Sequence, residues 1–403
     1  MKQKFVVIGG GAAGFFAAIN AAELHPELEV VILEGSNKLL QKVKVSGGGR
    51  CNVTHACFTP KELVEFYPRG KKELLGPFHT FMTGDTMAWF DERGVPLKIE
   101  DDNRIFPESD SSQTIIDCFL KAAKEAGVQI KLSTRVSEIR PKENDYVVLT
   151  NNGEFDADYV LVATGSNTKI WNLLQELGHT IVPPVPSLFT FNIKDERLNG
   201  IPGIAVPNGN VKVLGSKLEE SGPVLITHWG LSGPGILKLS AWGALELEKK
   251  NYLFKIQLNW LGLHKEDVLQ KLNGLQNRNS KKTILARSPF NEIPKRLWEK
   301  LVVAAGISQT TFWGHANKKQ LERLAIELTQ GEYQVNGKST FKDEFVTAGG
   351  VNLKEVNFKR FESKKHKNLF FAGEVLNIDA ITGGFNFQNA WTGGWIVATS
   401  VGT

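Results

Sequence analysis

The chain has 403 residues, of which 41% are hydrophobic and 23% charged, values close to those of globular proteins, so a disordered or fibrous chain is excluded. The length fits two or three domains of roughly 100–200 residues each. The net charge is only +5, and segment 264–300 carries that whole excess, with nine Lys and Arg against four Asp and Glu. Such a segment is usually a solvated helical face, and a surface that binds polyanions is the alternative.

The cysteine content argues against a disulfide-stabilised or zinc-binding protein. Cys51, Cys57 and Cys118 are too few for a disulfide framework in a chain of this size, and no Cys/His cluster has zinc-site spacing. We therefore expect no metal and a reducing, cytoplasmic setting. Glycines interrupt the first apolar run, and no stretch reaches the ~18–20 apolar residues that a membrane span needs. No membrane partner is expected.

The first 35 residues have the pattern of a βαβ unit. Lys4–Ile8 and Glu29–Leu33 are short apolar runs typical of buried parallel strands, and Ala12–Glu23 between them is rich in helix formers. Further along, helices are predicted at 86–93 and 112–126, and strands at 128–132, 136–140, 146–150 and 155–163. Together these elements predict an α/β domain with an inserted sheet.

From about residue 185 the pattern changes to short strands punctuated by Gly, Pro and Asn. Strands are predicted at 189–193, 204–206, 211–214 and 224–227, and helices at 235–249, 265–275, 294–305 and 318–329. A buried strand at 368–372, a Gly-Gly turn and a long apolar helix ending near Ser400 then restore the α/β pattern. We therefore expect that both chain ends complete one domain and that 186–342 is an insertion.

A glycine-rich turn follows the first strand. The sequence GGGAAG at 9–14 is a GxGxxG motif, weak evidence alone, but it follows a strand and opens a helix. In this context Gly9 permits the tight turn, Gly11 lets a pyrophosphate approach the backbone, and Gly14 lets helix and strand pack closely. Glu34 ends the second strand and can accept hydrogen bonds from ribose hydroxyls. A dinucleotide site is predicted.

Two further segments decide between NAD and FAD. SGGGRCN at 46–52 follows the ribose-binding strand, where an FAD protein must pass the far half of its cofactor; a flexible surface turn is the alternative. LFFAGE at 369–374 precedes Asp379, a further candidate cofactor ligand, and TGGFNFQ at 382–388. Glu374 can hold a ribityl hydroxyl, and the helix start near Gly384 can place amides at the flavin N1/C2=O edge. A plain core helix after a Gly turn is the alternative.

These motifs resemble the BaiN/RdsA group of FAD-dependent oxidoreductases, also called the YhiN family, which includes aminoacetone oxidase and bile-acid reductases. The resemblance covers most of the chain and rests on VVIGGGAAGFFAA, KVKVSGGGRCNVTH, VATGS, THWGLSGP, VTAGGV and LFFAGEVLNIDAITGGFNFQNAW, which stand in the family's order. It implies an α/β fold: a Rossmann-like, three-layer ββα FAD-binding domain (1–187 and 343–403) interrupted by a β-barrel (188–255 and 331–342) and a small helical insert (256–330).

The resemblance also implies which residues contact FAD. One departure is that Ser166-Asn167 stand where the family has a second glycine in the ATG motif. The implied positions are Gly9, Gly11, Ala12, Ala13, Gly14, Glu34, Lys42, Ser46, Gly47, Arg50, Asn52, Val136, Thr164, Gly165, Gly373, Glu374, Gly384, Asn386, Phe387 and Gln388.

Four residues are candidates for the substrate side, because THWGLSGP and VTAGG resemble family segments expected near the flavin face: His228, Ser232, Thr347 and Asn386. A hydrogen-bonded structural role for His228, and capping of the next helix by Ser232, are the alternatives.

The expected activity is hydride transfer between flavin N5 and a small organic substrate, with transient NADH or NADPH, or oxygen, as the partner. A disulfide reductase is disfavoured, because five residues rather than four separate Cys51 and Cys57 and no second GxGxxG is present. An FAD-containing RNA-binding or tRNA-modifying protein is the alternative from another class, although nucleic acid is not the expected partner, and a flavin-binding module without turnover is a third. The residues leave the oligomeric state, the substrate and the direction of transfer open.

Overall fold

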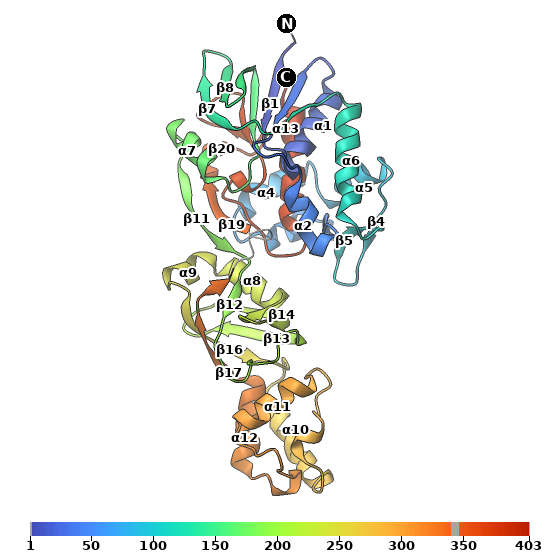
Figure 1. The fold of residues 1–403 in the computed structure, drawn as a ribbon, viewed down its shortest axis with the longest axis vertical. Helices are drawn as coiled ribbons and strands as arrows, with labels where there is room; N and C mark the ends of the chain where they lie inside the picture. Colours follow the sequence, from blue (N-terminus) through green and yellow to red (C-terminus); the bar gives the residue numbers. More distant parts are fainter. Residues whose placement is uncertain (1, 340–345, 403) are drawn as a thin grey trace. The chain divides into compact units, whose positions relative to one another are not determined.

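The computed structural model describes residues 2–339 and 346–402. The chain divides into two compact units, Met1–Val185 with Lys342–Thr403, and Pro186–Phe341. Both chain ends therefore belong to the first unit (Figure 1). Among the helices of the described residues, none is long and apolar enough to cross a membrane.

The first unit is built on a seven-stranded sheet that is parallel over its larger part. The short apolar runs bury both faces of their strands, which favours parallel pairing covered on both sides. The predicted βαβ unit is confirmed: β1 (Lys4–Ile8) pairs with β2 (Glu29–Leu33) through α1 (Ala12–Leu24). The strand order is β20 (Val356–Asn357), β21 (Glu362–Ser363), β22 (Leu369–Phe371), β10 (Tyr159–Val162), β1, β2 and β6 (Gln129–Lys131).

Helices and a small sheet cover this central sheet. Figure 1 shows α1, α6 (Ser112–Glu125) and α13 (Phe385–Ser400) together on one side of β1, and the antiparallel sheet of β7 (Val136–Pro141), β8 (Tyr146–Thr150) and β9 (Gly153–Ala157) on the other. The predicted last helix, α13, packs against α1. The small antiparallel sheet, the central sheet and the layer that contains these helices together form a three-layer ββα arrangement.

One strand prediction is wrong in the first unit. The run 155–163 is divided at Asp158 between β9 in the small sheet and β10 in the central one. The Asp158 carboxylate accepts a hydrogen bond from the backbone N–H of Lys4 (2.7 Å), and its own N–H donates to Lys4 O (3.0 Å). Through these two hydrogen bonds, Asp158 fixes the bend between β9 and β10 against the first residue of β1.

The first unit has further elements outside the central sheet, the last strand before the second unit, β11, running across the boundary at Val185. They are α2 (Gln41–Gly49), β3 (Thr54–His55), α3 (Pro60–Leu63), α4 (Lys71–Phe78), α5 (Thr83–Asp91), β4 (Leu97–Ile99), β5 (Arg104–Pro107), α7 (Thr168–Glu176), β11 (Ile181–Ser187) and β19 (Val346–Val351).

The second unit contains a seven-stranded antiparallel sheet. Its order is β17 (Gly331–Asn336), β16 (Leu253–Asn259), β13 (Ala205–Val213), β14 (Glu219–Ile226), β15 (Gly230–Ser232), β12 (Thr190–Asn192) and β18 (Lys338–Ser339). The strands predicted at 204–206 and 211–214 form the single strand β13, which bulges between Val206 and Gly209. The helix predicted at 235–249 is two helices, α8 (Pro234–Trp242) and α9 (Ala244–Lys249), because the chain breaks at Gly243, where a Cβ would lie 2.7 Å from Leu218.

Three further helices, α10 (Lys265–Arg278), α11 (Lys295–Ala304) and α12 (Lys318–Thr329), share one apolar core with this sheet. The Trp298 indole N–H donates to Ile284 O (2.9 Å), and its ring stacks with Trp313. Arg197 lies over the ring of Tyr333 in β17 and pairs with Glu327 in α12. The predicted division of this unit into a barrel and a separate helical domain, with the boundaries given above, stays a prediction.

A buried polar cluster joins three segments of the first unit. His179 is 3% exposed; its Nδ1 lies 3.1 Å from Glu355 Oε2 and its Nε2 lies 3.0 Å from Ser363 Oγ. Burial lowers the pKa of His179, outweighing the opposite effect of Glu355. Burial acts to raise the pKa of Glu355, but hydrogen bonds from Lys365, Thr180 and His179 bring it down to about 2.

This cluster predicts that the first unit loses stability in mild acid. A histidine with a lowered pKa in the folded state stabilises the fold in its neutral form, so stability is lost as the pH falls through the unfolded value of about 6.5 toward the folded one. Thermal melts between pH 8 and pH 5 should show a smaller decline for His179→Gln, which does not titrate, than for the wild type. Equal declines would contradict this role of His179.

Candidate cofactor site

The turn between β1 and α1 has the geometry predicted for its glycines. Gly9 has φ of +112°, and a Cβ on it would lie 2.5 Å from Ala163 O. A Cβ on Gly14 would lie 2.0 Å from Gly9 O, so helix and turn can pack only with glycine there. A Cβ on Gly11 would meet nothing within 4 Å, and no side chain caps α1. The amides that open α1, at Ala12 and Ala13, therefore face an open approach for a phosphate.

Glu34 supports this turn from the end of β2. One carboxylate oxygen accepts a hydrogen bond from Gly10 N–H and the other from Ser36 N–H, both at 2.8 Å. A carboxylate has about four lone-pair positions, so capacity for ribose hydroxyls remains. Val136, the predicted adenine-side contact, begins β7 and is half-buried.

The second glycine-rich segment forms a left-handed turn at the end of α2. Ser46 is extended, and Gly47, Gly48 and Gly49 have φ of +57°, +69° and +86°. A Cβ on Gly47 would lie 2.8 Å from the Phe106 ring, whereas Cβ atoms on Gly48 and Gly49 would meet nothing within 4 Å. The backbone is therefore open to a close ligand at two of the three glycines.

Arg50, predicted to contact FAD, has protein partners in this structure. Its guanidinium lies 3.9 Å from the Phe106 ring centre and pairs with Glu100 (2.5 Å) and Asp110 (3.3 Å). The hydrogen bond with Glu100 outweighs desolvation and raises the pKa of Arg50. This pairing gives Arg50 a role in fixing the β4–β5 hairpin, and its cofactor contact stays a prediction.

Residues of segment 52–70 form hydrogen bonds with several residues of the loop that leads into α13. The Asn52 amide is oriented so that its oxygen and its nitrogen both have partners. The oxygen accepts from Gly384 N–H at 3.0 Å, and the nitrogen donates to Thr54 O at 2.9 Å. His55 Nδ1 lies 3.1 Å from Gly383 O, and Ile381 N–H donates to Phe66 O at 3.0 Å.

Segment 52–70 also contacts the two ends of this loop. The Tyr67 hydroxyl donates to Phe385 O at 2.6 Å, and Arg69 forms a bidentate pair with the fully buried Asp379. The rings of Phe66 and Phe385 stack at 4.3 Å between centres. The flavin-side turn is thus fixed by the protein itself, and segment 52–70 is a set of supporting residues that the sequence analysis missed, except for Asn52.

Three predicted contacts at this turn use their side chains internally. Asp379 pairs with Arg69 as described, and the Asn386 amide both accepts from Ala380 N–H (3.0 Å) and donates to Ala380 O (3.2 Å). Gln388 is fully buried and accepts from the hydroxyls of Thr54 (2.6 Å) and Thr86 (3.0 Å). This geometry favours positioning roles for these side chains over the predicted ligand contacts. The Phe387 ring stacks on Trp391.

Other predicted contacts carry polar atoms that the protein leaves without partners. Thr164 Oγ1 and Glu374 Oε1 are buried and accept or donate no hydrogen bond among the described residues. Glu374 Oε2 pairs with Lys42, and a Cβ on Gly165 would lie 3.7 Å from that same oxygen. A Cβ on Gly373 would lie 3.3 Å from the Cβ of Ala13, at the start of α1. Buried unpaired polar atoms are costly, so a ligand with hydroxyl groups fits this position.

The four substrate-side candidates divide between the units. Thr347, on β19, and Asn386 belong to the first; the Thr347 hydroxyl is buried and has no hydrogen-bond partner among the residues that the structure describes. His228 and Ser232 belong to the second. Ser232 accepts from the Thr190 hydroxyl at 3.0 Å and does not cap α8, whose N-cap is Gly233. Their catalytic roles stay a prediction.

The cysteines are buried thiols. Burial raises the pKa of Cys51 to about 12 and that of Cys118 to about 11, and it also raises the pKa of Cys57. Because the thiolate is the reactive form, none of them is poised for disulfide exchange near neutral pH. Within the described residues, no group of three or more His, Cys, Asp or Glu could hold a metal ion.

The fold and these motifs agree with comparisons to known proteins. The family model described as HI0933-like protein Rossmann domain matches residues 3–400. The ribosomal RNA dihydrouridine synthase of Haemophilus influenzae is 28% identical over 98% of this chain and 98% of its own length, and the 3-dehydro-bile acid delta(4,6)-reductase of Clostridium scindens is 26% identical over 97% of each.

A solved structure shows the same fold at low identity. The 3-ketosteroid delta1-dehydrogenase of Sterolibacterium denitrificans is 12% identical, covers 99% of each chain and has a TM-score of 0.52. The match over residues 3–400 shows that this chain belongs to the HI0933-like (BaiN/RdsA) family, and the predicted class, an FAD-dependent oxidoreductase with a Rossmann-like fold, is confirmed.

Proposed function

We propose that this protein reduces a carbon–carbon double bond conjugated to a carbonyl group, taking its electrons from NADH or NADPH. The observation that carries the proposal is the single cradle formed by the glycine turn of α1, the Thr164–Gly165 turn and the Gly373–Glu374 turn, where Thr164 and Glu374 each have a buried oxygen that no described residue hydrogen-bonds. The two named relatives support the choice of reaction, since dihydrouridine and a reduced delta(4,6) bond both result from adding hydrogen to such a double bond.

Each part of the cradle has a distinct role toward FAD. Bound FAD would supply hydride at N5. The open α1 amides would hold the pyrophosphate, Glu34 the adenosine ribose, and Glu374 the ribityl chain. No side chain caps α13 among the described residues, so the positive end of its helix dipole would be free to stabilise the charge that develops at the flavin N1/C2=O edge on reduction.

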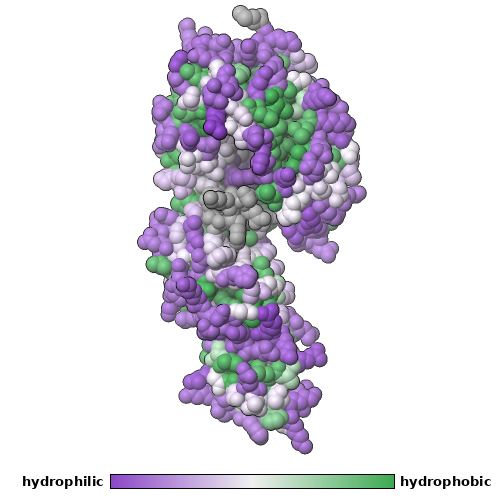
Figure 2. Space-filling view, viewed as in Figure 1, coloured by the Kyte–Doolittle hydropathy of each residue, from purple (hydrophilic) through white to green (hydrophobic). Residues whose placement is uncertain are grey.

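A second candidate, modification of RNA, is favoured by charge. The nine basic residues of 264–300 include Arg278, Lys281, Lys282 and Arg287, which are all exposed, and Figure 2 shows hydrophilic side chains around a central hydrophobic patch on the visible face of the helical part. One relative is named for ribosomal RNA. The reaction would be the same, with a uracil in RNA as the conjugated carbonyl compound.

Anaerobic spectroscopy of the FAD-loaded protein tests the proposal. NADH or NADPH should bleach the flavin, and a uracil-containing RNA or a 3-keto-4,6-diene steroid should restore its colour at a rate that depends on concentration. If only oxygen restores the colour, or if an amine bleaches it while nicotinamides do not, the protein is an oxidase and the proposal is wrong.

Gly11→Ala should separate cofactor binding from folding. The added methyl group meets no protein atom within 4 Å and the backbone there has φ of −95°, so the fold should be unchanged. It enters the approach of the pyrophosphate, and crowding there should weaken FAD binding about tenfold or more, ~1–3 kcal/mol. Gly84→Ala, on α5 and equally open, is the matched control. Equal FAD affinity in both variants would contradict the predicted pyrophosphate position.

Thr164→Val should act in opposite directions on the apoprotein and on the complex. The change keeps the shape of the side chain and removes a buried hydroxyl without a partner, so the apoprotein should keep its stability or gain up to about 1 kcal/mol. FAD affinity should fall, because the cofactor loses a hydrogen-bonding group. Denaturant unfolding of apoprotein and titration with FAD measure the two effects. A destabilised apoprotein would show that Thr164 serves the fold instead.

A further inference from the structure

The peptide group that joins Gly383 to Gly384, just before α13, is held at both of its polar ends. Its carbonyl oxygen, on Gly383, lies 3.1 Å from His55 Nδ1, and its N–H group, on Gly384, donates to Asn52 at 3.0 Å. A carbonyl oxygen only accepts hydrogen bonds, so Nδ1 of the imidazole carries the proton. Two side chains from one short segment thus fix the plane of a single peptide group.

The two glycines cannot fix this peptide by themselves. Gly383 has φ of +134° and Gly384 has φ of +91°, and a Cβ on Gly384 would lie 2.6 Å from Thr54 O. Only glycine fits such positions, but glycine also adopts many other backbone conformations. The orientation of the peptide between them is therefore set by the hydrogen bonds from His55 and Asn52.

The imidazole of His55 is itself held firmly. Its ring centre lies 4.5 Å from that of Phe385 and 5.7 Å from that of Phe66. The backbone of His55 pairs with Arg104 of β5, and the His55 carbonyl accepts a hydrogen bond from the Thr83 hydroxyl at 3.0 Å. Because this donor is already ordered, it orients the peptide without a further loss of side-chain entropy.

The amide groups that follow this peptide lack partners. The first hydrogen bond of α13 runs from Gln388 N–H to Gly384 O, at 3.1 Å. The N–H groups of Phe385, Asn386 and Phe387 precede it, and no described residue accepts a hydrogen bond from them. With the flavin placed as proposed above, these amides would face the edge of the ring that becomes negative on reduction.

We propose that His55 is a positioning residue that raises the reduction potential of the bound flavin. Together with Asn52 it fixes the Gly383–Gly384 peptide, and so it holds the open amides of α13 in the direction that stabilises the negative reduced flavin more than the neutral oxidised form. This inference rests on the cofactor position given under the proposed function. It does not depend on which compound the flavin reduces.

Two substitutions separate the hydrogen bond of His55 from the packing of its ring. His55→Phe keeps an aromatic ring beside Phe385 and removes the donor, whereas His55→Asn keeps a side-chain N–H donor and removes the ring. The measurement is the midpoint potential of the full-length, FAD-loaded protein, obtained anaerobically by equilibration with a reference dye.

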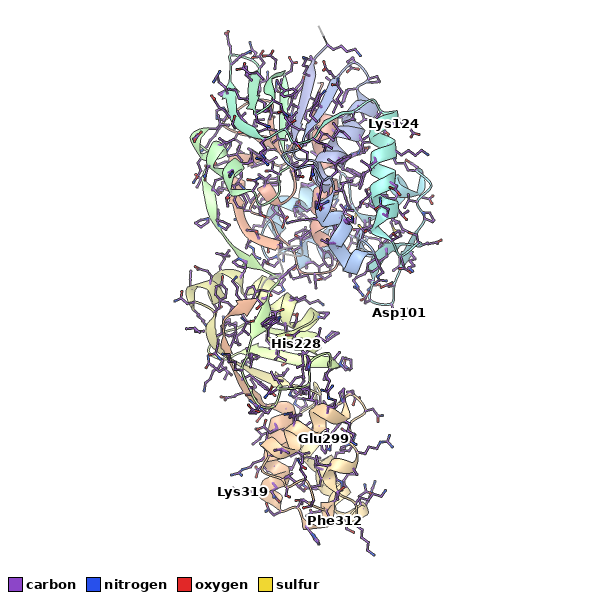
Figure 3. The ribbon with its side chains drawn as sticks, in the orientation of Figure 1. Asp101, Lys124, His228, Glu299, Phe312 and Lys319 are labelled. Carbon is purple, nitrogen blue, oxygen red and sulfur yellow. The ribbon has the colours of Figure 1, made fainter. Side chains whose placement is uncertain are left out.

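His55→Phe should make this potential more negative, by an amount that corresponds to an about fivefold loss of affinity for reduced FAD relative to oxidised FAD. His55→Asn should recover part of the shift. Titration with oxidised FAD should give the same affinity as the wild type in both variants, which shows that the site is still folded. His315→Phe is the matched control and should change nothing, since His315 also lies beside a phenylalanine, Phe312 (Figure 3), but in the second unit.

An unchanged potential in His55→Phe, or an equal shift in His55→Phe and His55→Asn, would overturn the inference. Asn52→Ala gives a second test, because it removes the partner of the same peptide at its N–H end. It should also lower the potential, and the shift in the double variant with His55→Phe should be smaller than the sum of the two single shifts. Additive shifts would mean that the two side chains act independently, against the inference.

Hydrogen exchange and reoxidation distinguish this inference from the proposed function. If FAD leaves the amides of residues 385–387 unprotected from exchange, the proposed flavin position and this inference are both wrong. If the potential shifts as expected but no conjugated carbonyl compound reoxidises the flavin, the proposed reaction is wrong and the role of His55 is upheld.

Discussion

The packing of α1 against α13 is the contact on which the first unit depends. A Cβ on Gly394 would lie 3.0 Å from Ala13 O and 3.1 Å from Ala17 N, so the helices approach as closely as glycine allows. Because Ala13 is the second residue of α1 and Gly394 lies nine residues after the start of α13, the two helix starts are separated by roughly 14 Å along the α13 axis. One extended dinucleotide can bridge that separation, with its phosphates at one helix start and its ring system at the other.

The polar residues around these helix starts fall into two groups, and the difference is physical. Asn52, Gln388 and Asp379 have their hydrogen-bonding capacity satisfied by the protein, so they fix the shape of the flavin-side turn. Thr164 and Glu374 each retain a buried oxygen with no hydrogen-bond partner in the described part of the chain, so they are suited to a ligand. One sequence motif can contain both residues that support the turn and residues suited to contact a ligand, and the amino-acid sequence of the motif does not distinguish the two.

Local patterns predicted the parallel strands, the glycine turn and both terminal helices, because apolar runs and glycine spacing are local features. The strands β16 and β17 are absent from the prediction, although LFKIQLN at 253–259 alternates between exposed and buried residues as a half-buried strand does. The break at Gly243 depends on its close approach to Leu218, and the support of the loop before α13 by segment 52–70 depends on contacts such as that of Tyr67 with Phe385. Both are contacts between residues far apart in the sequence. Such contacts leave no periodic signal in the sequence.

Hydrogen–deuterium exchange of the apoprotein and the FAD-loaded protein tests most directly whether both chain ends hold one cofactor. With FAD added at one equivalent, amides at the start of α1 and at the start of α13 should gain protection together, to the same fractional occupancy. Protection confined to the start of α1, with the amides that follow Gly384 unchanged, would contradict the account.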